Sequence, residues 1–388
     1  MHPVLALALV IVAGIGVTRL TRPSLRHPRL FDDLLATGAA FLLLGLLLGP
    51  GLGAIDVAGL GLLQPVLALA IGWMGAVFGA RLEWRMVRRI SGRTWLVGAT
   101  LALPILATTT VIAVVLARKI PALATAWGHP SLAVALALGG ALTTAASQRG
   151  PRLGRRNALI DTLFGVLAVI LASALSHPHV ALRAAVLTVL AGLGLGGLFV
   201  ALARGGLVPD PAEAGVAALA AILCGAGFSY AAGLSPFVVC GLEAAVIMSV
   251  SPVPIRHAVA GMLTRWETGL YAAFLILAGA LLRPMTPWVL FAAPVFALIR
   301  VLVRWVTVRF GLDQVDPVWR SFSFAPPPEF AHSAIRQGAT AVALAGGFDL
   351  VRSAPGAVLV TVLLSVMAAE AIAALTPLTA RPTPAEVS

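Results

Sequence analysis

The chain has 388 residues, of which 60% are hydrophobic and 11% are charged, and its mean hydropathy is +0.99. A soluble domain needs a polar surface and does not reach such values, so the composition excludes a soluble protein and predicts many membrane spans. The formal charge of +12 does not indicate a nucleic-acid partner, because the arginines lie between apolar segments and not on one polar face.

The sequence lacks the patterns that enzymes and cofactor-binding proteins carry. It contains no nucleophile elbow, phosphate loop or pair of catalytic carboxylates, which predicts a protein that is not an enzyme and needs no cofactor. Cys224 and Cys240 fall in apolar runs and are expected to be small buried hydrophobes. The stretch GLGLGG, Gly192 to Gly197, imitates a dinucleotide fingerprint, but without a preceding strand it predicts close helix packing.

Apolar segments follow one another along the whole chain. A bilayer core about 30 Å thick requires about 20 apolar residues in a helix, and fewer in a broken span. On this basis we expect thirteen spans at 3–19, 34–50, 57–79, 95–117, 131–147, 158–175, 180–203, 213–231, 234–250, 264–283, 286–308, 334–349 and 355–378. The predicted organisation is one transmembrane domain over 1–379 with a short tail, 380–388, because the longest polar stretch, about 309–333, cannot bury a core.

The distribution of arginine predicts the orientation. Arginine-rich loops face the cytoplasm, and here they alternate with loops that carry few basic residues. The first span is followed by Arg19, Arg22, Arg26 and Arg29, which resist translocation. We therefore expect the N-terminus outside and the C-terminus in the cytoplasm.

The odd number of spans predicts an internal repeat. Two six-span repeats, 3–175 and 213–378, joined by a linking span at 180–203 would have opposite orientations, as in secondary transporters. The fifth span of each half, LALGGALTTAAS and QGATAVALAGG, is short and rich in small residues and threonine. Such spans indicate a central binding site, although small residues also serve tight helix packing.

Ionisable side chains inside the spans are the candidate functional residues. Each costs at least about 2.5–3.5 kcal/mol to insert, so each needs a partner, an aqueous cavity or a function. The candidates are Asp161, Glu243, Arg300, Arg304 and Glu370, with Glu267, Arg336 and Asp349 near span ends.

Asp161 has two interpretations. It could complement the dipole at a helix N-terminus, or it could form a buried ion pair with Arg300, which lies deep in its own span. Arg304, one turn after Arg300, is expected to extend its side chain toward the cytoplasmic surface. Glu243 and Glu370 could each be a hydrogen-bonded acid within the bundle or a titrating proton site.

With these segments laid out, the chain resembles the monovalent cation:proton antiporter family of the sodium/hydrogen exchanger type. LLLGLLLGPGLGAI resembles an early glycine-rich span end of the family, and AIGWMGAVFGARLEWRMVRR resembles a span that runs into a basic loop. LALGGALTTAAS and IRQGATAVALA resemble its two unwound spans, CGAGFSYAAGLSPFVVCGLEAAVIMS its paired spans around Leu-Ser-Pro, and FLILAGALL the span after them. The resemblance covers nearly the whole chain and implies an all-α fold with two crossing unwound spans.

The resemblance also implies an ion site. The family places Asn-Asp or Asp-Asp on the span after the first unwound one, which corresponds to Asp161 and Thr162 here. The basic partner of the first position corresponds to Arg300, and the unwound spans would line the site with Thr143, Thr144, Ser147, Gln337 and Thr340. Family members are usually homodimers, and the implied location is a bacterial inner membrane.

Thr162 stands where the family has its cation- and proton-binding carboxylate, and a threonine hydroxyl does not titrate in this range. Asp161 could itself alternate between Arg300 and the substrate, or Glu243 could titrate in its place. Ion exchange could also be lost. We expect a Na⁺ or K⁺:proton antiporter working by alternating access, with a transport-silent scaffold or sensor, or an organic or anionic solute transporter, as alternatives.

Overall fold

The computed structural model describes residues 39–51, 57–127, 132–145, 152–206, 211–280, 287–308, 339–352 and 357–375. The expected span at 3–19 and the tail at 380–388 lie outside the described residues, as do Ser147 and Gln337.

Every element in the described part of the chain is a helix. The helices are α3 (Ala39–Leu46), continued by the π-helical turn η1 (Leu47–Gly51), α4 (Val57–Ala80), α5 (Trp84–Val87), α6 (Gly92–Lys119), α7 (Pro121–Ala126), α8 (Leu132–Thr143), α9 (Arg152–Ser176), α10 (Ala181–Arg204), α11 (Pro211–Ala231), α12 (Pro236–Val250), α13 (Val253–Ala280), α14 (Pro287–Val306), α18 (Ala339–Val351) and α19 (Ala357–Leu375).

Each expected span from 34–50 onward coincides with one of these helices. Among the described residues, 6 helices are long and apolar enough to cross a membrane by length and composition. Several others are short apolar helices of 10–17 residues, including α8, α12 and α18. The predicted all-α membrane fold is therefore confirmed.

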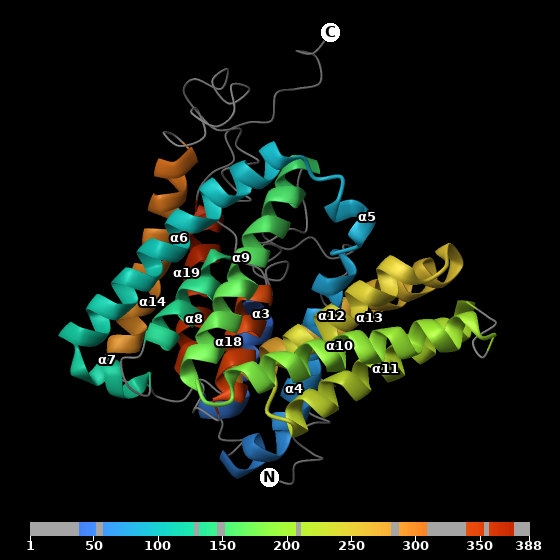
Figure 1. Cartoon of the computed structure of the whole chain (residues 1–388). Coiled ribbons are helices and arrows are strands. Elements are labelled where there is room, and N and C mark those ends of the chain that lie inside the picture. The colour runs from blue at the N-terminus through green and yellow to red at the C-terminus, as the bar shows by residue number, and fades with distance from the viewer. Residues whose placement is uncertain are drawn as a thin grey trace, which may run out of the picture.

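The helices gather into two groups (Figure 1). α6, α8, α9, α14, α18 and α19 pack mainly against one another, and we name them the core bundle. α3, α4, α10, α11, α12 and α13 form the second group, which we name the scaffold bundle. The groups meet chiefly where α4 contacts α18. Each bundle draws helices from both halves of the chain.

Glycines let the scaffold helices pack with their backbones close together. A Cβ atom added at Gly75 or Gly79 on α4 would overlap the carbonyl oxygen of Phe237 or Gly241 on α12. On α10, a Cβ at Gly196 would lie 2.8 Å from the carbonyl oxygen of Glu243. The prediction that the glycine-rich stretch of α10 serves helix packing is confirmed at Gly192 and Gly196, which face α12.

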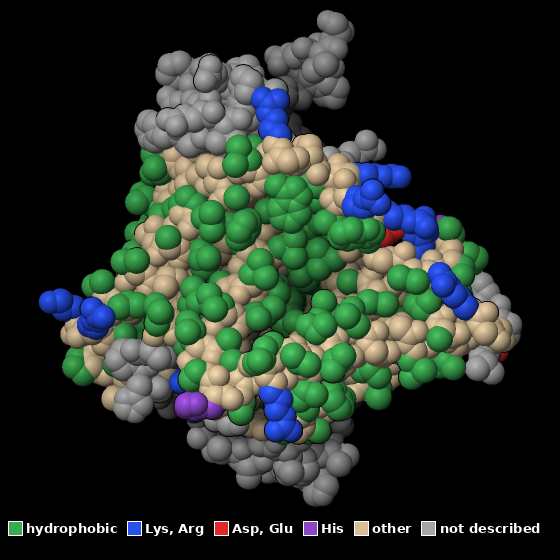
Figure 2. Space-filling model, in the orientation of Figure 1, with side chains coloured by type: hydrophobic (Ala, Val, Ile, Leu, Met, Phe, Trp, Pro, Cys, Tyr) green, Lys and Arg blue, Asp and Glu red, His purple; other side chains and the backbone are tan. Residues whose placement is uncertain are grey.

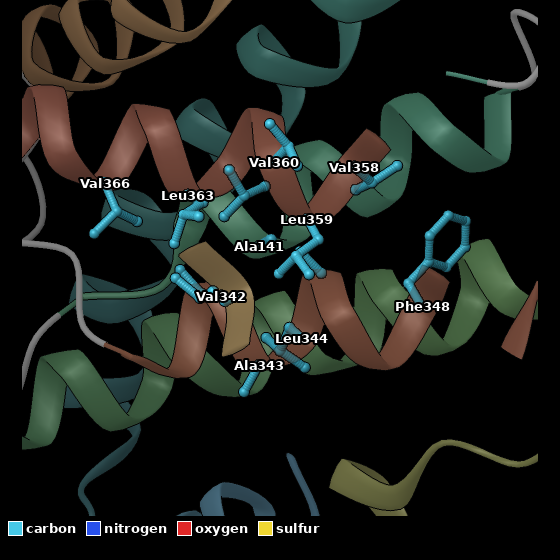
Figure 3. Close-up of a cluster of buried hydrophobic side chains, with 14 of the residues drawn as sticks. Ala141, Val342, Ala343, Leu344, Phe348, Val358, Leu359, Val360, Leu363 and Val366 are labelled. Atoms are coloured by element: carbon cyan, nitrogen blue, oxygen red, sulfur yellow. The ribbon is translucent and has the colours of Figure 1, made fainter. Parts of the chain in front are cut away.

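The core bundle is filled by aliphatic side chains from three helices (Figure 3). Val342 and Leu344 of α18, Leu359 and Leu363 of α19, and Ala141 of α8 are fully or almost fully buried in one cluster. This packing fixes both short helices, α8 and α18, against the same neighbours.

Asp349 joins α18 to the start of α19. Its Oδ2 atom accepts a 2.8 Å hydrogen bond from the backbone N–H of Leu359, in the first turn of α19. The first N–H groups of a helix have no partner within the helix, so this carboxylate satisfies one of them. Asp349 therefore has a structural role at the span end where the sequence places it.

Two helices begin earlier than the hydropathy pattern predicts. α13 begins at Val253, eleven residues before the expected span, and α9 begins at Arg152 and not at 158. Hydropathy marks only the apolar part of a helix, whereas the first turn of α13 is held by the Arg256–Glu83 ion pair. The helices are therefore longer than their membrane-crossing portions.

Substitution of Gly79 tests the close α4–α12 contact. The change Gly79→Ala should destabilise the protein by about 1–3 kcal/mol, because the methyl group has no room beside the Gly241 backbone. Gly194→Ala on α10 is the matched control, since nothing lies within 4 Å of its added Cβ atom. Thermal unfolding in detergent measures both variants. Equal melting temperatures would contradict the packing described here.

Candidate ion site

The site begins where α8 ends. α8 has 12 residues and is therefore about 18 Å long, which is too short for a bilayer core of about 30 Å. After Thr143 the chain leaves the helix, and the described residues Thr144 and Ala145 are not helical. The last carbonyl groups of α8 consequently need hydrogen-bond donors within the protein, because lipid supplies none.

Arg300 on α14 supplies these donors. Its Nε atom donates to the carbonyl oxygen of Leu142 at 2.9 Å, and its Nη2 atom donates to that of Thr144 at 3.1 Å. Arg300 is fully buried. A guanidinium group at this position also neutralises the negative end of the α8 dipole. Arg300 thus stabilises the end of the interrupted span.

Asp161 on α9 forms an ion pair with Arg304. The Nη2 atom of Arg304 lies 2.7 Å from Oδ2 of Asp161, and the two residues are 4% and 0% exposed. The sequence predicted Arg300 as the partner and a surface-directed Arg304, and the second of these predictions is wrong. Arg300 and Arg304 are one helical turn apart and share the buried face of α14, so both reach the same region.

The position of Asp161 within α9 excludes a helix N-terminal role. α9 begins at Arg152, so Asp161 lies about two and a half turns into the helix. The dipole acts within the first turn. The ion pair with Arg304 is therefore the interaction that accommodates this carboxylate.

Two glycines bring α9 against the end of α8. A Cβ atom at Gly140 would lie 2.8 Å from the carbonyl oxygen of Gly165, and one at Gly165 would lie 2.9 Å from Cγ2 of Thr144. The helices therefore touch through their backbones, one turn before α8 ends. This contact places the α8 terminus beside the helix that carries Asp161 and Thr162.

The predicted threonines are buried and their hydroxyl hydrogens are engaged. Thr143 donates to Gly139 at 2.7 Å, and Thr144 donates to Ala141 at 2.9 Å, each within or next to α8. Thr162 donates to Ala158 at 2.8 Å within α9. A hydroxyl group that donates to its own helix has only lone pairs left to offer. These threonines can therefore act as acceptors toward a cation.

The ion pair leaves polar atoms without partners in the described part of the chain. The Oδ1 atom of Asp161 and the Nε and Nη1 atoms of Arg304 are buried and form no hydrogen bond there. Buried polar groups are satisfied in nearly all proteins, so these atoms indicate a place for water or a bound solute. A hard cation would take the carboxylate oxygen, whereas an anion would take the guanidinium hydrogens.

The other sequence candidates lie elsewhere. Thr340 is partly buried in the first turn of α18. This helix packs against α8 and α9. Glu243 is fully buried on α12, where its Oε2 atom packs against Gly225 of α11. Neither carboxylate oxygen of Glu243 accepts a hydrogen bond from a described residue. Because Asp161 lies in the core bundle, the structure does not bring these two carboxylates into one site.

Arg304 is the site residue whose role the sequence analysis missed. Its four-residue spacing from Arg300, in the apolar stretch IRVLVRW, places both arginines on one helix face. That spacing is the sequence feature that indicates a second arginine on the buried face of the helix.

The described site therefore combines a carboxylate paired with Arg304, acceptor hydroxyl groups, and a helix terminus held by Arg300. In the part of the chain that the structure describes, no three His, Cys, Asp or Glu side chains gather into a metal-binding group. The arrangement can bind a small ion and can move a proton onto or off Asp161.

The fold has a counterpart among solved structures. The structure of the sodium proton antiporter MjNhaP1 from Methanocaldococcus jannaschii matches 97% of this chain and 95% of its own, with a TM-score of 0.56 and 15% sequence identity. No protein-family model and no curated protein matches the chain. The likeness covers the whole domain and concerns its fold. The protein is accordingly a multi-pass integral membrane protein with the antiporter fold, which is a transporter fold and is not usually that of an enzyme.

Proposed function

We propose that the protein is a secondary transporter that exchanges a monovalent cation, Na⁺ or K⁺, for a proton across the membrane. The observation that carries the proposal is the buried Asp161 carboxylate, which holds Arg304 with one oxygen and leaves the other without a partner among the described residues. It lies beside the end of an interrupted span in an antiporter fold. The expected orientation, with the N-terminus outside, and the expected homodimer in a bacterial inner membrane belong to the same proposal.

In the proposed cycle, Asp161 is the only group that changes its charge. When it is ionised, its free oxygen and the lone pairs of nearby hydroxyl and carbonyl groups replace part of the water around the cation. When it takes a proton, the cation loses its negative ligand and leaves. Alternating access, by movement of the core bundle relative to the scaffold bundle, would then expose the site to each side in turn.

Arg304 serves as the internal counter-ion in this proposal. An ionised Asp161 without a cation would be a costly buried charge, and the 2.7 Å ion pair compensates it in the empty state. Thr162 cannot supply a second charge. The exchange of one proton for one cation therefore depends on Asp161 alone.

A second candidate function rests on the charge balance of the same site. Among the described residues, the end of α8 and Asp161 are held by two buried guanidinium groups, those of Arg300 and Arg304, and Arg304 has two nitrogen atoms with unused hydrogens. Such a site attracts an anion as well as a cation. An anionic solute transporter is therefore the alternative that these atoms favour.

Asp161→Asn tests the proposed antiport. In liposomes containing the purified protein, an imposed Na⁺ or K⁺ gradient should change the internal pH, and the variant should reduce that change to the level of empty liposomes. Glu243→Gln is the matched control, because it makes the same carboxylate-to-amide change at a buried position in the scaffold bundle. Loss of flux in the control but not in Asp161→Asn would contradict the assignment. A pH change driven by choline chloride, and not by sodium gluconate, would instead support anion transport.

Arg304→Gln tests the counter-ion role. Removing the guanidinium group leaves Asp161 buried and unpaired, which should lower the free energy of unfolding by about 3–5 kcal/mol. The double variant Asp161→Asn with Arg304→Gln removes both charges and should recover most of that loss. Thermal unfolding in detergent gives the coupling between the two substitutions. Additive effects would show that the pair does not act as a unit.

Thr162→Asp tests whether the threonine has silenced transport. If the chain retains the fold without the activity, a carboxylate at this position should create cation-dependent proton flux in liposomes in which the wild-type protein gives none. If the wild-type protein already transports through Asp161, the variant should shift the pH dependence of the flux, because a second titrating group enters the site. Silence of both proteins in this assay would count against antiport by this chain.

A further inference from the structure

The connection between the two bundles carries a cluster of arginines. α4 of the scaffold bundle is joined to α6 of the core bundle by residues 81–91, which include the short helix α5. Arg85, Arg88 and Arg89 are exposed there. No hydrogen bond or ion pair holds these three side chains to any described residue, which distinguishes them from the neighbouring Arg81.

In the part of the chain that the structure describes, the two carboxylates near α5 have basic partners. Glu83 forms an ion pair with Arg256, and Glu267 lies 3.5 Å from Arg81. Because these carboxylates have partners, they do not offset the charges of Arg85, Arg88 and Arg89. Among the described residues, the connection therefore presents a positive surface without compensating carboxylates.

Large apolar side chains lie among these arginines. Trp84 is 61% exposed and Met86 is 53% exposed. Figure 2 shows Lys and Arg side chains gathered over the position of α5, with hydrophobic side chains beside them. Tryptophan is enriched where a membrane meets water, because its ring is apolar and its N–H is polar.

The connection is held in place on the scaffold bundle. The backbone N–H of Trp84 donates to Oγ of Ser249 at the end of α12, at 3.0 Å, and the Glu83–Arg256 pair ties the same residues to α13. The following segment ends at Ser91, whose Oγ accepts from the N–H of Thr94 and caps α6. The arginines therefore project from a fixed support.

We propose that α5 and the turn after it bind the headgroups of anionic phospholipids, with Arg85, Arg88 and Arg89 on the phosphates and Trp84 and Met86 in the acyl boundary. Guanidinium groups donate paired hydrogen bonds to phosphate oxygens. Basic residues next to a membrane helix are attracted to the anionic cytoplasmic leaflet, which is the side where the expected orientation puts this loop. The bound lipid would anchor the connection between the two bundles. This site does not depend on the proposed transport activity.

Native mass spectrometry of the full chain with equimolar phosphatidylglycerol and phosphatidylcholine tests the proposal. The wild-type protein should retain phosphatidylglycerol preferentially. The triple variant Arg85→Gln, Arg88→Gln, Arg89→Gln should weaken that binding roughly tenfold to a hundredfold and leave phosphatidylcholine unchanged. The matched control neutralises three exposed cations at the ends of other helices, Arg118, Lys119 and Arg183, and should behave like the wild type.

Further variants separate the outcomes. Replacing the three arginines by lysine keeps the charge and should keep most of the binding, and Trp84→Ala with Met86→Ala should weaken the binding of both lipids. Unchanged melting temperatures in detergent would show that the variants fold. Equal retention of phosphatidylglycerol by the arginine and control variants would overturn the proposal. Displacement of phosphatidylglycerol by millimolar inorganic phosphate would also overturn the proposal, because the site would then recognise a free anion and not a lipid.

Discussion

When a helix ends inside a bilayer, its last carbonyl groups must accept hydrogen bonds from donors within the protein. This constraint shapes the core bundle. α8 is too short to cross the membrane. The buried Arg300 is the donor here, because it donates hydrogen bonds to the carbonyl oxygens of Leu142 and Thr144. An arginine buried for that purpose brings a full charge into the interior of the helix bundle. The surrounding helices therefore have to compensate the charge of this arginine as well as pack against it.

The compensation links three helices. The helix dipole of α8 offsets part of the Arg300 charge, and the Asp161 carboxylate on α9 offsets Arg304, one turn further along α14. The glycine contact between α8 and α9 keeps these groups within reach of one another. In the proposed exchange, the arginines of this site are structural and the Asp161 carboxylate changes its charge. A transport cycle built on this arrangement uses the same group to bind a proton and to bind a cation.

Much of this arrangement follows from the sequence, and the remainder has physical reasons. Hydropathy locates the spans because lipid forces every apolar segment into a helix, and the small-residue stretch before Asp161 identifies α8 as interrupted. The choice between Arg300 and Arg304 as the partner of Asp161 is beyond sequence reasoning, since both occupy one face of α14 and only the relative height of two helices decides it. The true start of α9 is likewise hidden, because its first turns are polar.

If Asp161 carries the proposed exchange, cation binding and proton binding compete at its carboxylate. Proton release on addition of NaCl or KCl to the purified protein, in weakly buffered detergent solution, tests this competition without requiring transport. The proposed competition should give proton release that saturates with cation concentration in the wild-type protein and is absent in Asp161→Asn, with choline chloride as the blank. Release of the same size in the variant, or none in the wild-type protein at any pH between 5 and 9, would contradict it.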